Sequence, residues 1–213
     1  MKRIICMLLI VSCVAVLFAC GNNADNNANI EGVDAETAQF FEKVQQSDPT
    51  GITTKTHITR PNGGVYEGYY TTTITENGFV FDYEYQQRNE EFVVGEESKE
   101  TVKGLVKYED GRYTHNGENV SAAPDVDYMN ISLELVPQNV DEFTFSKDKK
   151  TLTSTITKEQ VENIFGVKID AENALLKITI NGTYLTKIEL NYTTADGTVV
   201  YVETGFVYVA AQE

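Results

Sequence analysis

The chain has 213 residues and a formal net charge of −15 at pH 7, with 17 basic residues against 32 acidic ones. The phosphates of nucleic acids and anionic lipid headgroups repel such an acidic surface, so we expect no nucleic-acid partner and no membrane attachment through a basic patch. The length suits one domain with a sizeable core.

The first 19 residues have the composition of an export signal. Two basic residues precede an apolar run over residues 4–19, which is shorter than the about 20 residues that a membrane-spanning helix needs. The sequence LFACG at residues 17–21 resembles the lipobox of bacterial lipoproteins, although Phe18 replaces the small or branched residue usual there. The resemblance implies cleavage before Cys20 and a diacylglycerol on its thiol. The alternative is an ordinary secretory signal that happens to end in cysteine.

The segment after the signal is Asn-rich and has little apolar surface to bury, which predicts a flexible tether at residues 20–33. The cysteines Cys6, Cys13 and Cys20 all lie in or beside the signal. The predicted single β-rich domain at residues 34–213 therefore holds no thiol for a disulfide or a zinc site. Together these features predict a lipid-anchored protein on the extracytoplasmic face of a cell membrane, and the acidic, Asn-, Thr- and Tyr-rich body suits a Gram-positive surface.

The domain begins with a predicted helix from residue 34 to about residue 46. Asp34 is a suitable N-cap, and Ser47-Asp48-Pro49 follows the expected end of the helix. Its apolar residues repeat at helical spacing and predict the buried face. They are Ala35, Ala38, Phe40, Phe41 and Val44.

Alternating patterns at residues 52–58 and 79–85 then predict β-strands with one buried face. Asn-Gly or Asp-Gly pairs accept the positive φ angles of tight hairpins and predict a meandering antiparallel sheet. They stand at residues 62–63, 77–78, 110–111, 116–117, 181–182 and 196–197, and a further polar turn is expected at residues 147–150.

A second helix is predicted between the strands. Thr157 and Gln160 have the spacing of a capping box, and Gly166 is placed to end the helix. Three strands close the chain, and the last of them, at residues 199–209, is apolar on both faces. A strand of this kind is covered on both faces or has a cavity on one of them.

The order of elements resembles that of the LolA/LppX-type lipoprotein carriers and related lipoproteins of Gram-positive bacteria. The resemblance rests on the lipid-bearing cysteine, the N-terminal helix, the long run of strands, the strand–helix unit at residues 152–165 and the closing meander ALLKITINGTYLTKIELNYTTADGTVVYVETGFVYV. It implies a mainly β fold: a curved antiparallel half-barrel with an N-terminal helix, one or two short inserted helices and a cavity for acyl chains. It also favours a helix at residues 128–136, where the alternation alone would fit a strand.

The sequence offers no catalytic or cofactor motif, so we expect no enzyme, no cofactor and no metal site. The only histidines, His57 and His115, are expected on the exposed surface. The acidic pairs are interpreted as a solvated surface, with a calcium site at Asp125 and Asp127 or a carboxylate-based hydrolase as the less favoured alternatives.

Aromatic residues crowd two neighbouring strands, and they could line a ligand site or form plain core beneath the first helix, of which the core is favoured. The candidate ligand contacts are Tyr66, Tyr70, Phe79, Phe81, Tyr83 and Phe206. The favoured function is a non-enzymatic lipoprotein that binds or carries an apolar, lipid-like ligand. The alternative is a structural or protein-interaction surface lipoprotein with a closed core, whose protein partner the sequence does not identify.

Overall fold

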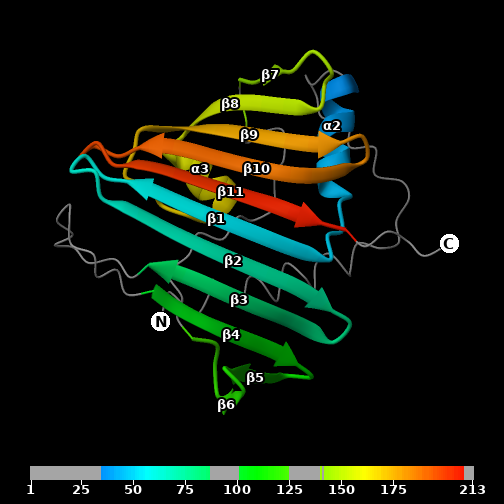
Figure 1. Cartoon of the computed structure of the whole chain (residues 1–213). Coiled ribbons are helices and arrows are strands. Elements are labelled where there is room, and N and C mark those ends of the chain that lie inside the picture. The colour runs from blue at the N-terminus through cyan, green and yellow to red at the C-terminus, as the bar shows by residue number, and fades with distance from the viewer. Residues whose placement is uncertain (1–34, 87–100, 125–139, 141, 209–213) are drawn as a thin grey trace.

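The computed structural model describes residues 35–86, 101–124, 140 and 142–208. Their strands form one antiparallel sheet in the order β6-β5-β4-β3-β2-β1-β11-β10-β9-β8-β7 (Figure 1). The elements are α2 (Ala35–Gln45), β1 (Gly51–Thr59), β2 (Val65–Thr75), β3 (Gly78–Gln86), β4 (Thr101–Glu109), β5 (Arg112–His115), β6 (Glu118–Val120), β7 (Thr144–Phe145), β8 (Thr151–Thr157), α3 (Lys158–Phe165), β9 (Asn173–Asn181), β10 (Tyr184–Thr193) and β11 (Val199–Val207).

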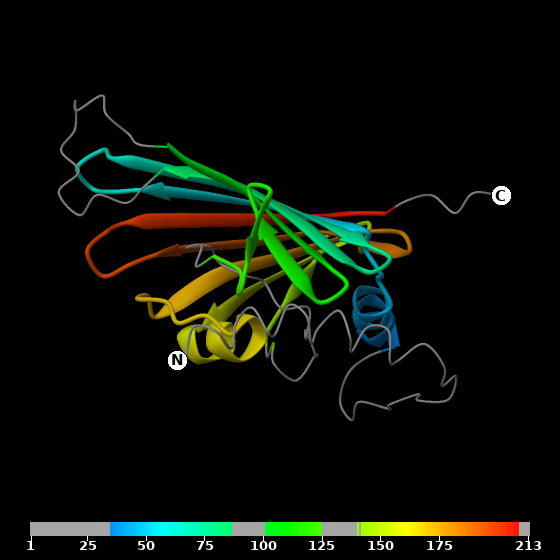
Figure 2. The same ribbon diagram turned by 90° about the horizontal axis from the view of Figure 1, so that it is seen from below.

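The sheet is twisted and open, and both helices lie on the same side of it, near opposite ends of the strands (Figure 2). We call the side that the helices cover the inner face and the opposite side the outer face. The predicted fold class is confirmed: a mainly β protein with an antiparallel sheet, an N-terminal helix and a short inserted helix. The segments at residues 1–33 and 128–136, with their predicted signal, tether and helix, lie outside the described residues.

The sheet consists of two meanders that meet along one seam. Strands β1–β6 lie in the sheet in their chain order, and so do strands β7–β11. Within each meander, every strand therefore pairs with the strand that precedes or follows it in the chain. The seam joins β1 to β11 over nine residues of β1, from Gly51 opposite Val207 to Thr59 opposite Val199. The first and the last described strands therefore lie side by side in the middle of the sheet.

All six predicted Asn-Gly and Asp-Gly turns lie at hairpin connections. Asp110-Gly111 and Asn116-Gly117 have positive φ at both residues, 49° and 80° in the first pair and 51° and 88° in the second, as a type I′ turn requires. Gly78 is needed for a different reason than the predicted one. A Cβ at this residue would lie 1.9 Å from the carbonyl oxygen of Tyr108 on β4, so the close approach of two backbones excludes a side chain here.

The N-terminal helix is present, but its buried face differs slightly from the prediction. Thr37, Phe40, Phe41 and Val44 are buried, whereas Ala35 is exposed. These buried side chains cover the inner face at β9 and β10. The large rings of Phe40 and Phe41 set the rotation of the helix. A rotation that buried Ala35 would expose these rings, and the apolar area lost from the core would exceed the area that the small alanine side chain buries.

The end of α2 is fixed to an irregularity in β10. The pairing of β10 with β9 shifts between Leu185 and Lys187. The Ser47 hydroxyl donates to the carbonyl of Lys43 at 2.8 Å and accepts the backbone N–H of Leu185 at 2.7 Å, while the Tyr208 hydroxyl donates to the Leu185 carbonyl at 2.6 Å. Two side chains thus bond the backbone N–H and C=O of Leu185, the residue beside the irregularity.

The second helix has the predicted ends. The Thr157 side chain accepts the backbone N–H of Gln160, and the Gln160 side chain accepts the backbone N–H of Thr157 in return. Gly166 ends the helix with a φ of 66°. The capping box aligns α3 so that Val161, Ile164 and Phe165 are buried against the sheet.

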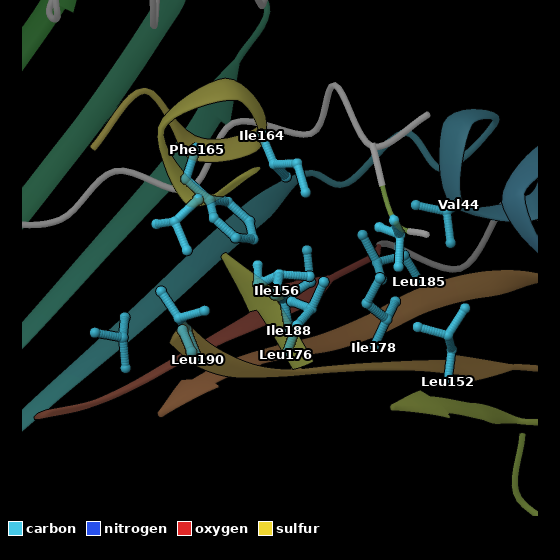
Figure 3. Close-up of a cluster of buried hydrophobic side chains, with 14 of the residues drawn as sticks. Val44, Leu152, Ile156, Ile164, Phe165, Leu176, Ile178, Leu185, Ile188 and Leu190 are labelled. Atoms are coloured by element: carbon cyan, nitrogen blue, oxygen red, sulfur yellow. The ribbon is translucent and has the colours of Figure 1, made fainter. Parts of the chain in front are cut away.

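The main core lies between the two helices and the inner face of β8–β11. In Figure 3, Ile164 and Phe165 of α3 and Val44 of α2 face the aliphatic side chains that rise from the strands. A second, aromatic cluster occupies the inner face of β2–β4. Its buried members are Tyr70, Phe79, Phe81, Tyr83 and Val106.

The outer face of β11 corrects one expectation. Val200, Val202 and Phe206 are buried on the inner face, but Val199 and Val207 on the outer face are 39% and 51% exposed. Of the two expected alternatives, a cover on both faces of β11 is therefore wrong, because its apolar outer residues are exposed. The cavity described below lies on the inner face, where Val200 lines it.

A row of mostly charged residues runs straight across the outer face, each member directly opposite the next on the neighbouring strand. We call it the outer row, and in sheet order it is Lys177, Glu189, Glu203, Lys55, Tyr69, Glu84 and Lys103. Opposite charges meet at its two ends, where Lys177 lies 3.1 Å from Glu189 and Lys103 lies 2.9 Å from Glu84. This row keeps the outer face polar although the inner face is apolar.

Candidate functional site

A cavity of about 680 Å³ lies between the inner face of the sheet and the loop that follows α3. Its wall is the loop segment at residues 167–170, and its mouth is formed by the β1–β2 and β10–β11 turns. The strands on both sides of the seam supply its floor. The floor residues are Thr56, Ile58, Tyr66, Tyr70, Tyr192 and Val200.

The strand register brings the floor together. Ile58 on β1 is opposite Tyr66 on β2 and Val200 on β11, so one row of inward side chains crosses the seam. Val200 is in turn opposite Tyr192 on β10. Residues directly opposite each other on adjacent strands face the same side of the sheet. Because Ile58 faces the inner side, Tyr66, Val200 and Tyr192 face that side as well and reach the cavity.

Gly68 makes room for the two inward-facing tyrosines of β2, Tyr66 and Tyr70. Its missing side chain leaves space over the strand, where the hydroxyls of Tyr66 and Tyr70 meet at 3.1 Å. A Cβ at Gly68 would lie 2.6 Å from the Tyr70 hydroxyl oxygen and 2.8 Å from its ring. The glycine therefore allows the Tyr70 ring to lie along the sheet between the cavity and the aromatic cluster, to which it also belongs.

Thr56 and Thr54 have similar positions on β1 but differ in hydrogen bonding and in their place beside the cavity. Both lie on the inner face of β1, and both are 7% exposed. The Thr54 hydroxyl is hydrogen-bonded to the Thr204 hydroxyl at 3.1 Å. Thr56 also lines the cavity, but its hydroxyl oxygen is fully buried and has no hydrogen-bond partner among the described residues.

The charged side chains belong to the wall and the mouth of the cavity, and the floor has none. Among its described lining residues these are Arg60, Lys168, Asp170 and Asp196, each exposed or half-buried. Lys168 lies 3.3 Å from Glu162 of α3. The carboxylate of Asp196 accepts the hydroxyl of Thr194 and the backbone N–H of Thr198, and these bonds hold the pKa of Asp196 below its ordinary value.

Asp196 therefore stabilises the β10–β11 turn. The floor itself is uncharged. The arrangement can hold a molecule with an apolar body inside and its charged or strongly polar groups at the rim.

A second cavity of about 680 Å³ shares Ile169, Asp170 and Tyr192 with the first. Several of its remaining lining residues are exposed polar residues at strand ends, among them Glu172, Asn173 and Asn191. The first cavity is the better candidate site, because it alone of the two reaches the buried residues of both the main core and the aromatic cluster.

The structure divides the predicted ligand contacts between three places. Tyr66 and Tyr70 line the cavity. Phe79, Phe81 and Tyr83 lie in the aromatic cluster, where the Phe81 ring stacks on Tyr70 at a centroid distance of 6.4 Å. Phe206 lies in the main core, directly opposite Ile52 on β1. Cys20 lies outside the described residues.

Sequence reasoning missed the rest of the floor and the wall. Thr56 carried a usable signal, since it is a polar residue at an inward position of an alternating strand. The alternation along its strand also placed Tyr192 on the inward face, but the sequence did not show which residues of other strands would lie beside it. The wall at residues 167–170 belongs to no motif, and its place beside β1 and β2 follows only from the assembled sheet.

The two histidines do not lie free on the surface as expected. His57 is half-buried, with its Nδ1 3.2 Å from a Glu67 carboxylate oxygen and its Nε2 3.2 Å from the Thr59 hydroxyl. His115 is half-buried beside Tyr83, whose hydroxyl lies 2.9 Å from Nε2. His57 contacts a side chain of the adjacent strand β2, whereas His115 on β5 reaches Tyr83 on β3 across β4, and neither histidine lines the cavity.

Two features are absent from the described residues. These residues contain no group of three or more histidine, cysteine or acidic side chains that could hold a metal ion. Within the same part of the chain, no helix is both long and apolar enough to cross a membrane. The calcium alternative at Asp125 and Asp127 falls outside it.

Comparison with known proteins adds no assignment. No protein-family model matches the chain, and no curated protein matches it. Among solved structures, it is similar to one described as the crystal structure of an N-terminal dehydratase from the difficidin assembly line. The identity is 8%, the match covers 76% of this chain and 78% of that chain, and the TM-score is 0.14. A similarity of this size supports no conclusion about fold or function.

Proposed function

We propose that the chain is the precursor of a membrane-anchored extracytoplasmic lipoprotein whose body binds an apolar, lipid-like ligand without catalysing a reaction. The observation that carries the proposal is the cavity beneath the loop after α3. Its volume of about 680 Å³ lies within the range of small-molecule sites. Its floor is aromatic and aliphatic, apart from one threonine, while its charges belong to the wall and the mouth.

The distribution of polarity favours binding over catalysis. Hydrolysis by carboxylates needs two acids that face each other across the substrate. The acids among the described lining residues are Asp170 and Asp196, and the carboxylate of Asp196 is held by the turn. An amphiphile fits better, because its apolar part would cover Ile58 and Val200 while its polar part stays in water at the mouth.

Membrane attachment in this proposal depends on Cys20. The net charge of −15 works against adsorption to anionic headgroups, so the lipid on the cysteine must supply the affinity. Replacement of Cys20 by alanine tests this part. In a bacterial host fed labelled fatty acid, the wild-type chain should be labelled and partition with detergent, whereas the Cys20→Ala chain should do neither. Equal labelling of both chains would contradict the anchor.

Mass spectrometry tests the cavity part. The protein would be residues 21–213, which contain every described helix and strand. Compared under native and denaturing conditions, it should carry an excess mass of several hundred daltons that is lost on denaturation. The matched variant is Val167→Trp, which should lack this excess mass. Val167 is a half-buried residue of the wall, and a larger side chain there fills the cavity without entering the sheet. Equal native and denatured masses after incubation with mixed membrane lipids would contradict the proposal.

The outer face supports a second candidate, a structural or protein-interaction lipoprotein. Several large apolar side chains are exposed there, on four different strands. They are Tyr69, Leu105, Leu175, Val199 and Val207. Their dispersion argues for a weak or polar contact surface rather than one large apolar patch. The protein-interaction function would be favoured if the native mass shows no ligand and a protein partner is captured through the outer face.

A further inference from the structure

We propose that Asn181 is a site of spontaneous covalent modification, where the asparagine side chain cyclises onto the backbone nitrogen of Gly182 and then opens to aspartate or isoaspartate. The site is the turn between β9 and β10. The reaction is intramolecular and needs only water, so this inference does not depend on the proposed binding function.

The bonds that change all belong to two neighbouring residues. The backbone nitrogen of Gly182 attacks the side-chain carbonyl carbon of Asn181 and loses its proton to water. The bond from that carbon to Nδ2 breaks, ammonia leaves, and a succinimide ring remains. Water then opens the ring at either of its carbonyl groups, which yields aspartate or isoaspartate. Glycine favours the attack, because it has no side chain to hinder the approach and its backbone is the least restricted.

The chain has four Asn-Gly pairs, and the fold distinguishes between them. They stand at residues 62–63, 77–78, 116–117 and 181–182, all among the described residues. Two conditions favour the reaction, because the two reacting atoms must come together. The N–H of the glycine must be free of hydrogen bonds, and the asparagine side chain must be free to turn toward it.

The pair at residues 62–63 meets neither condition. The Gly63 N–H donates to the carbonyl of Arg60 at 2.9 Å. The side-chain oxygen of Asn62 accepts the N–H of Gly64 at 3.0 Å. Both reacting groups are therefore held in the β1–β2 turn.

The pairs at residues 77–78 and 116–117 are held by neighbouring strands. Gly78 lies within the sheet, opposite Thr75 on one side and Glu109 on the other. Asn116 is bound twice to one residue of β4. Its side-chain oxygen accepts the N–H of Leu105 at 2.9 Å, and its own N–H donates to the Leu105 carbonyl at 2.8 Å. Each reaction would first have to break such contacts.

The pair at residues 181–182 meets both conditions. Asn181 and Gly182 are exposed, and a Cβ at Gly182 would have no atom within 4 Å. Neither the Asn181 side chain nor the Gly182 N–H has a hydrogen-bond partner among the described residues. The Thr183 N–H donates to the Asn181 backbone carbonyl at 2.6 Å, which engages neither the nucleophile nor the side chain.

The modification would act on the joint between α2 and β10. Isoaspartate lengthens the main chain by one methylene group at the end of β9, and either product adds a negative charge. Asn181 is opposite Tyr184, and the next pair is Ile180 with Leu185. The Leu185 N–H is the one that Ser47 accepts, so a change at residue 181 loosens this bond through the hairpin.

Incubation of residues 21–213 in mildly alkaline buffer, followed by proteolysis and mass spectrometry, tests the inference. Conversion adds about 1 Da to a peptide and divides it into two chromatographic peaks. The Asn181 peptide should convert about tenfold faster than the Asn62 peptide, whose reaction must first break a hydrogen bond. In urea all four Asn-Gly peptides should convert at similar rates. Asn181→Gln is the matched variant and should abolish conversion of this peptide alone, because the longer side chain does not close the same ring.

Conversion of another Asn-Gly pair first, or the same relative rates in the folded protein as in urea, would overturn the inference. A second measurement tests the consequence for the fold. Hydrogen exchange at the Leu185 amide should be faster in the incubated wild type than in Asn181→Gln incubated for the same time. Equal exchange in the presence of isoaspartate would overturn the link to the joint.

Discussion

Glu189 and Glu203 lie directly opposite each other on β10 and β11, and one hydroxyl, that of Tyr201, is 2.9 Å from the first carboxylate and 2.8 Å from the second. Like charges at such positions normally destabilise a sheet. Here Lys187 lies 3.2 Å from Glu189 and 3.4 Å from Glu203, and Lys177 lies 3.1 Å from Glu189. Burial, together with the hydrogen bonds to both acids, raises the pKa of Tyr201, which keeps the hydroxyl protonated as their shared donor.

Removal of that hydroxyl should destabilise the protein. Tyr201→Phe leaves the ring in place but deprives the two carboxylates of their shared donor, and hydrogen bonds to charged groups contribute more than neutral ones. We expect the free energy of unfolding in urea to fall by about 1–2 kcal/mol. Tyr69→Phe is the control, because Tyr69 is exposed in the same outer row, and its loss should stay within about 0.5 kcal/mol. Equal losses would show that the cluster adds nothing.

The same cluster predicts how stability depends on pH. Burial alone would raise the pKa of Glu189, but hydrogen bonds from Tyr201, Lys177 and Lys187 together hold it below its ordinary value. A carboxyl with a lowered folded pKa stabilises the fold above its unfolded pKa of about 4.3, and this contribution is lost as the pH falls through the folded value. Tm measured from pH 7 downward should therefore fall more steeply below about pH 4.3 in the wild type than in Glu189→Gln. Parallel curves would contradict the assignment.

Replacement by alanine should destabilise the protein strongly at Gly78 and change its stability little at Gly51. At Gly78 the new methyl group would lie 1.9 Å from the backbone oxygen of Tyr108, so β3 and β4 must separate. At Gly51 the nearest atoms would be 3.5 Å away, an ordinary contact. We expect Gly78→Ala to lower the free energy of unfolding by about 2–3 kcal/mol. Gly51→Ala should change it by less than about 1 kcal/mol. A tolerated Gly78→Ala would mean that the close approach of these strands is not required.

Ser47→Ala should loosen the joint between α2 and β10. The buried N–H of Leu185 would lose its acceptor, at an expected cost of about 1–3 kcal/mol. Hydrogen exchange at the Leu185 amide should quicken while the amides of β2 and β3 keep their protection. An exposed serine in the same protein, Ser121, provides the matched alanine control. Unchanged exchange at Leu185 would mean that another group accepts this proton.

Local patterns in the sequence were sufficient to predict most of the elements. Alternation gave the inward residues of β1 and β3, and the Asn-Gly and Asp-Gly pairs gave the hairpins, because both signals depend only on near neighbours in the chain. The rotation of α2 was less well predicted, because alanines and aromatics share its apolar stripe. Only packing against β9 and β10 decides that Phe40 and Phe41 are buried and Ala35 is not.

The candidate site was predictable only in part, and the reason is the seam. Tyr66 and Tyr70 could be named because aromatic residues crowd β2. Val200 and Tyr192 become their neighbours only when β1 pairs with β11, and no local signal specifies which distant strands will pair. The exposed outer face of β11 shows the same limit. Strand parity predicts two faces, but the number of layers that cover them depends on the whole sheet.

The seam also sets the order in which this protein can become functional. Each meander can form through short hairpins, whereas the seam joins residues as far apart as Thr54 and Thr204, 150 positions along the chain. Contacts of such separation form late because a long loop must close first. The cavity floor straddles the seam, with Ile58 on one side and Val200 on the other. A half-folded chain therefore lacks the floor of the proposed binding site, so ligand capture, if the proposal holds, would signal that the two halves of the molecule have joined.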